Sequence, residues 1–120
     1  MKKILFVSLL FFAAQTMQAQ VFDAKAITSQ VLAKLVPSLA LTNDQQPQVS
    51  DAVVDFLTSK ADIIPLQKSD PSAYVSKFNA LNGAMIGKLK GILTAKQMTT
   101  FLGLRPKATD TGNVLTHLFY

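Results

Sequence analysis

The sequence predicts an all-α protein, a small bundle of about four helices followed by an apolar C-terminal tail. Apolar residues recur at spacings of three and four along most of the chain, which is the period of one helix face. The apolar–polar alternation that is typical of strands never persists for more than a few positions after residue 20. A five-residue pattern that opens helices occurs twice, as Leu41-Thr42-Asn43-Asp44-Gln45 and as Leu93-Thr94-Ala95-Lys96-Gln97.

The start of the chain has the layout of a secretory signal peptide. Lys2 and Lys3 precede the uncharged apolar run Ile4–Ala14, and Ala19 is a small residue after which cleavage is expected. The run is shorter than the roughly 20 apolar residues of a transmembrane helix. We therefore predict a removed signal at 1–19, a single helical domain at 20–120, a periplasmic or secreted location and no stable membrane insertion after cleavage. The alternative is an uncleaved anchor.

The first two helices are expected at about 23–36 and 43–63. In the first, the apolar positions have helical spacing and Pro37 is expected to end the helix. In the second, the apolar positions again lie on one side, Asp51 and Asp55 lie outside that stripe, and Pro65 ends the helix. The two apolar stripes consist of Ile27, Val31, Leu32 and Leu35, and of Val49, Val53, Phe56, Leu57 and Ile63 or Ile64.

A loop is expected at 65–69, and Asp70-Pro71 then predicts a helix start because Asp is a good N-cap and Pro suits the first helical position. This third helix should run over 71–90 and stop at Gly91. Its apolar stripe is long and regular, and consists of Tyr74, Phe78, Leu81, Met85, Leu89 and Ile92.

Thr94 should open a short fourth helix at 95–103. After a polar, turn-like stretch, the chain finishes with an apolar tail at Val114–Tyr120. We expect this tail to pack on the body, since solvated termini seldom carry so many large apolar side chains. The alternative is a loose end.

The composition excludes several functions. There is no cysteine, so thiol catalysis, zinc–thiolate sites and disulfides are ruled out. Without the signal, Lys and Arg number 10 against seven acids, all of them Asp, a mild excess that resembles no nucleic-acid footprint. His117 is the only histidine and has no companion ligands for a metal site. Asp51 and Asp55 are better explained as a solvated face than as paired catalytic acids, so we expect no enzyme and no cofactor.

Two helix faces suggest contacts with other elements or molecules. Gly83, Gly87 and Gly91 recur every four residues and would allow another helix to approach closely. We favour a helix-packing contact inside one monomer, and a homodimer contact is the alternative. Tyr74, Phe78 and Met85 are candidates for an apolar binding face, although helical spacing more often marks core residues.

The two five-residue patterns resemble the LTxxQ signatures of the Spy/CpxP-like periplasmic proteins, with Leu41, Thr42 and Gln45 in the first copy and Leu93, Thr94 and Gln97 in the second. Ile92 before the second copy agrees with the resemblance, which covers roughly residues 39–104. It implies a small helical envelope protein, often a curved dimer. Members include chaperones that shield unfolded clients without ATP, stress-signalling modulators and metal-responsive proteins.

Together, the residues and the resemblance lead to an exported helical binding protein that holds a protein client or partner on an apolar, mildly basic surface of the second and third helices. A structural or regulatory interaction module with one specific partner is the first alternative. A carrier of a small apolar ligand is the second, and it would need an enclosed pocket between helices.

Overall fold

The computed structural model describes residues 22–120, and the expected signal peptide at 1–19 lies outside them. Its elements, in chain order, are α2 (Ala24–Leu39), α3 (Gln45–Ile63), α4 (Leu66–Ser69), α5 (Pro71–Ile92), α6 (Ala95–Gly103) and α7 (Thr116–Phe119). No strand occurs in this part of the chain. The predicted all-α class is therefore confirmed.

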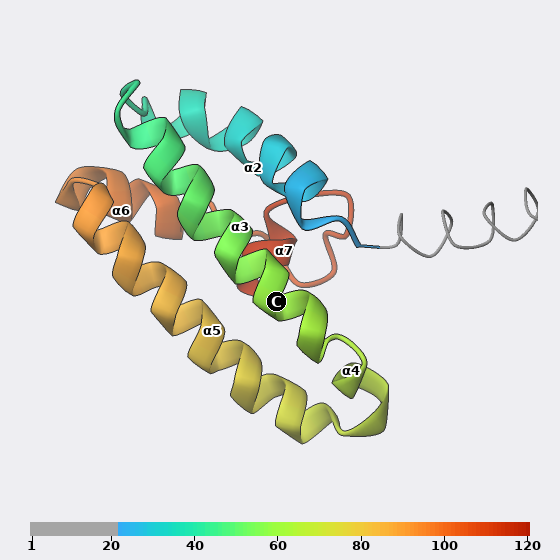
Figure 1. The fold of residues 1–120 in the computed structure, drawn as a ribbon. Helices are drawn as coiled ribbons and strands as arrows, with labels where there is room; N and C mark the ends of the chain where they lie inside the picture. Colours follow the sequence, from blue (N-terminus) through green and yellow to red (C-terminus); the bar gives the residue numbers. More distant parts are fainter. Residues whose placement is uncertain (1–21) are drawn as a thin grey trace, which may run out of the picture.

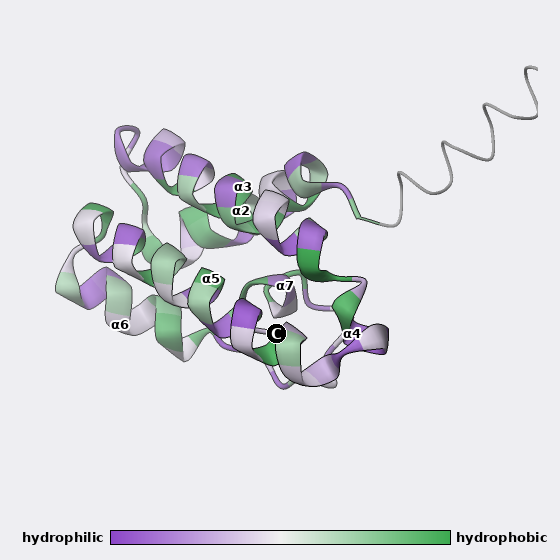
Figure 2. Cartoon of the chain, turned by 60° about the horizontal axis from the view of Figure 1, so that its bottom comes forward, coloured by the Kyte–Doolittle hydropathy of each residue, from purple (hydrophilic) through white to green (hydrophobic). Residues whose placement is uncertain are grey.

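The three long helices lie side by side, with α3 packed between α2 and α5 (Figure 1). The short α4 turns the chain from α3 into α5, and α6 folds back to contact α2 and α5. The small α7 lies behind α3 in this view. Purple and green alternate along the helices in Figure 2, and the apolar faces meet in one core that every helix except α4 supplies with buried residues. None of the helices between residues 22 and 120 combines the length and the apolar character that a membrane crossing requires.

The expected helix starts are formed as predicted in two cases. The Asp70 carboxylate accepts from the Ala73 N–H at 3.1 Å and Pro71 stands at the first helical position. Thr94 makes a complete capping box with Gln97. At the N-terminus of α2, the Asp23 carboxylate accepts from two backbone N–H groups. Capping side chains thus fix where these helices begin.

Several predicted boundaries are wrong. Pro37 does not end α2, which continues to Leu39 and is closed by Ala40 in the left-handed conformation (φ 53°). Pro37 stands in the last turn and is exposed, so the carbonyl that loses its helical donor there can be solvated. Likewise, Gly91 lies inside α5, and Leu93 in extended conformation caps that helix. The expected loop at 65–69 contains the single-turn helix α4.

The tail packs on the body, as expected. Leu118 is fully buried, and Leu115 and Phe119 are nearly so. Phe119 lies against Phe101 of α6, with ring centroids 5.4 Å apart. The C-terminal segment, defined here as residues 113–120, is therefore part of the hydrophobic core.

Candidate functional site: the seat of the C-terminal segment

The two sequence motifs meet in space and hold the ends of the bundle together. Gln45 and Gln97 exchange a pair of amide hydrogen bonds of 2.8 and 3.0 Å. Each amide also donates to a backbone carbonyl next to the other motif, Gln45 to Ile92 and Gln97 to Leu39, both at 3.1 Å. The motif glutamines thus link the start of α3 to the start of α6.

Both motifs also make the reciprocal capping bonds expected of them. The Thr94 hydroxyl accepts from the Gln97 backbone N–H at 3.1 Å, and the side-chain Oε1 of Gln97 accepts from the Thr94 N–H at 2.9 Å. The corresponding bonds between Thr42 and Gln45 are 3.2 and 3.0 Å. Leu41 and Leu93 are buried. These six residues have a structural role: their threonine hydroxyls and glutamine amides make the hydrogen bonds of the two motifs, and their leucines are part of the core.

The small-residue face of α5 does not form the contact that we favoured. Gly83, Gly87 and Gly91 are exposed, and a Cβ atom added at any of them would meet nothing within 4 Å. The expected close packing inside one monomer is therefore wrong. In the described part of the chain this face is open.

The candidate apolar face is covered rather than open. Tyr74, Phe78 and Met85 are all buried, and Tyr74 and Phe78 lie beside the C-terminal segment, with which they line a common cavity of about 260 Å³. Asp51 and Asp55 are exposed, as expected, and Asp55 makes a 3.5 Å ion pair with Lys88. No cluster of metal-ligating side chains occurs among residues 22–120.

Side chains of α3 and α5 bind the C-terminal segment through its main chain. Lys60 Nζ donates to the carbonyl of His117 at 2.7 Å, and Asn82 Nδ2 donates to the carbonyl of Leu118, also at 2.7 Å. The Tyr74 hydroxyl donates to the Tyr120 carbonyl at 3.2 Å. We call the residues that hold the segment the tail site, and they are Lys60, Tyr74, Phe78, Asn82 and Phe101.

Lys60 is the residue that sequence reasoning missed. It is only 4% exposed, and its ammonium lies 5.3 Å from the centre of the Phe78 ring. Burial lowers its pKa to about 8, because a charged amine is poorly solvated there. A signal was present in the sequence: Lys60 stands four residues after Phe56 and three before Ile63, within the apolar stripe of α3.

His117 lies half-buried on the C-terminal segment, beside Lys60. Its ring stands edge-on to Phe22, with centroids 5.9 Å apart. It shares a cavity of about 290 Å³ with Lys60. Burial, and then the charge of Lys60, lower the pKa of His117.

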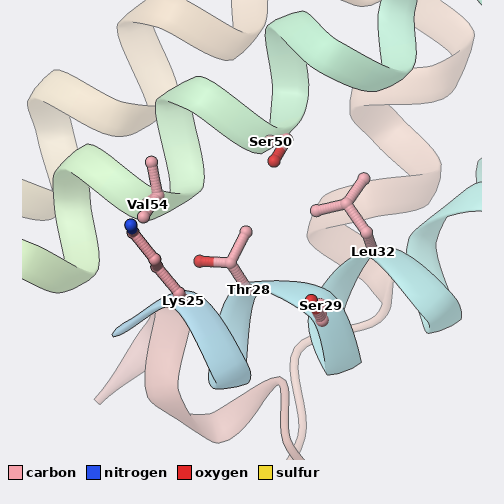
Figure 3. A pocket seen from close by; sticks show the side chains of 6 residues that line it. All are labelled: Lys25, Thr28, Ser29, Leu32, Ser50 and Val54. Carbon is pink, nitrogen blue, oxygen red and sulfur yellow. The ribbon is translucent and has the colours of Figure 1, made fainter. Parts of the chain in front are cut away.

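The largest volumes between side chains lie elsewhere and are open to solvent. Figure 3 shows one of them, a recess of about 490 Å³ between α2 and α3, with Thr28 and Leu32 on one side and Ser50 and Val54 on the other. The Thr28 hydroxyl is already bonded to the Ala24 carbonyl at 2.7 Å. This recess therefore lacks the enclosure that a carrier site would use.

No family model matches the chain, and the searches of curated proteins and of solved structures give no match either.

Proposed function

We propose that this chain is an exported helical binding protein that holds unfolded segments of other proteins without ATP, in the manner of a Spy-like periplasmic chaperone. The observation that carries this proposal is the tail site, where three side chains donate hydrogen bonds to three backbone carbonyl oxygens of a short apolar segment. Every polypeptide has such carbonyls, so this mode of binding suits clients of varied sequence.

The apolar part of the site supports the same proposal. The segment inserts Leu118 and Phe119 into the core, where Phe119 contacts Phe101. Fully burying one such side chain contributes roughly 1.5–3 kcal/mol. A client segment with similar apolar side chains would gain the same contacts once the chain's own segment has moved aside.

The edge of the site offers a client its first contact. Val75 is 56% exposed and lines the same cavity as Tyr74, Phe78 and Phe119. Among residues 22–120, the other large apolar side chain that is exposed is Leu102 on α6 (48% exposed).

The test is light scattering of a reduced, aggregating client protein in the presence of equimolar mature chain, residues 20–120. We expect the chain to suppress aggregation, Val75→Ser to weaken that suppression and the matched Leu102→Ser variant to leave it unchanged. If the wild-type chain leaves aggregation unaffected, the chaperone proposal is wrong and an interaction module with one specific partner is favoured. If Leu102→Ser is the damaging change, the client surface lies on α6 and not at the tail site.

A further inference from the structure

Lys60 is a buried cation that no acidic side chain among residues 22–120 neutralises. Its contacts are the His117 carbonyl and the face of the Phe78 ring. Within residues 22–120, the ion pair between side chains is that of Lys88 with Asp55, both exposed. Charged groups that are this deeply buried are usually paired. The Lys60 ammonium therefore lacks the negatively charged partner that such a position normally provides.

The cavity beside Lys60 has room for an acidic side chain. Its volume is about 290 Å³, and no Asp or Glu side chain lines it. The C-terminal segment lines this cavity with Thr116, His117 and Tyr120, of which His117 is a base. When His117 is protonated, the charge of Lys60 repels it.

From this mismatch we infer that the tail site prefers another occupant, an apolar segment of a protein client that carries Asp or Glu where the chain's own segment carries His117. The inference rests on the proposed function and names the client chemistry. The acidic side chain would pair with Lys60 in a charge-assisted hydrogen bond. The donors of Asn82 and Tyr74 would bind the client's carbonyls as they now bind those of Leu118 and Tyr120.

Three fluorescent eight-residue peptides test this preference by anisotropy with the mature chain at pH 7. The first has the sequence of residues 113–120, and the other two have Glu or Gln at the place of His117. We expect the Glu peptide to bind roughly tenfold more tightly than the Gln peptide, which is the gain of one charge-assisted contact. Equal affinities, or failure of all three peptides to bind, would overturn the inference.

Two lysine variants locate the effect. Lys60→Met should abolish the advantage of the Glu peptide, whereas Lys77→Met, at an exposed position on α5, should preserve it. An advantage that persists in Lys60→Met would show that a different cation selects the acid, and the inference would be wrong. If decanoate binds but the Glu peptide does not, the site takes a small carboxylate and not a protein segment.

A change within the chain gives an independent readout. His117→Glu should raise the Tm above that of His117→Gln and should weaken binding of the Glu peptide, because the chain's own segment then pairs with Lys60. A lower Tm for His117→Glu than for His117→Gln would contradict the inference. The aggregation assay separates the two proposals. If the chain suppresses aggregation but shows no preference for the Glu peptide, the chaperone function stands and this inference is wrong. If it prefers the Glu peptide but does not suppress aggregation, the chaperone function is wrong and the acid preference of the tail site stands.

Discussion

Two glutamine side chains each combine two structural roles that the motif alone does not predict. Gln45 and Gln97 accept from the N–H of their own capping threonine, and each donates across the bundle to the other glutamine and to a carbonyl. The capping role was readable from the sequence because it depends on a spacing of three residues. The pairing was not, since no local signal indicates that side chains 52 positions apart will meet.

Gln45→Glu separates these two roles. A carboxylate can still accept from the Thr42 N–H, but it cannot donate to Ile92 or to Gln97. We expect a loss of about 1–3 kcal/mol in the free energy of unfolding, measured by urea denaturation. Gln30→Glu, at an exposed position on α2, is the matched control. An equal loss in both variants would show that the hydrogen bonds across the bundle do not contribute to stability.

The caps can be tested at the threonines. Thr94→Ala should lower the free energy of unfolding by about 1 kcal/mol because the Gln97 N–H loses its acceptor, and Thr42→Ala should do so by a similar amount. Thr94→Ser keeps the hydroxyl and should retain most of the stability. Thr100→Ala, on the exposed face of α6, should have little effect. Thermal melts followed by circular dichroism distinguish these outcomes.

The pKa of Lys60 predicts a pH dependence of stability. Burial lowers this pKa from 10.5 to about 8, so the unfolded chain binds a proton more readily than the folded one, and stability should rise with pH between these values. The penalty is fully present below pH 8. The expected gain is at most about 3 kcal/mol. Urea denaturation at several pH values should give a slope that Lys60→Met abolishes and Lys77→Met retains.

At the scale of single elements, α5 has an exposed glycine face on a long helix. Because a Cβ atom at Gly87 would meet nothing within 4 Å, Gly87→Ala should stabilise the protein by roughly 0.5–1 kcal/mol through helix propensity alone. A rise in Tm with unchanged sedimentation is the expected result. A destabilised Gly87→Ala variant would indicate that another molecule covers this face in solution.

Element boundaries show where sequence reasoning succeeds and where it stops. The starts of α5 and α6 were predicted correctly because Asp70, Pro71 and Thr94 determine them locally. The ends of α2 and α5 were missed because Pro37 and Gly91, which were expected to end these helices, lie inside their last turns, where the helix accommodates either residue. The helix α4 was missed because its four residues carry no apolar period.

At the scale of the whole molecule, the C-terminal segment completes the core of α3, α5 and α6. Its apolar composition correctly predicted burial, whereas its partners Lys60, Tyr74 and Asn82 could not be assigned from the sequence because they lie 36 to 57 positions away. The tail site is therefore a product of the tertiary fold. The clustering of its donors around one segment is visible only in the assembled bundle.

Shortening the most buried side chain of the C-terminal segment tests how much the segment contributes to stability. Leu118 is fully buried, so Leu118→Ala should lower the free energy of unfolding by about 2–5 kcal/mol. Leu102→Ala, at a half-exposed position, should change it by less than about 1 kcal/mol. Similar values for both variants in urea denaturation would mean that the segment contributes little to stability.

Residues 104–112 join α6 to the C-terminal segment and keep that segment close to the tail site. A short linker holds an attached group at a high effective concentration, in the millimolar range for a flexible one. A free segment of equal affinity must approach that concentration before it competes, whereas a better-matched one competes at much lower levels. If the chain binds clients as we propose, this linkage would set a threshold: dilute apolar sequences would not displace the segment, and accumulated unfolded protein would.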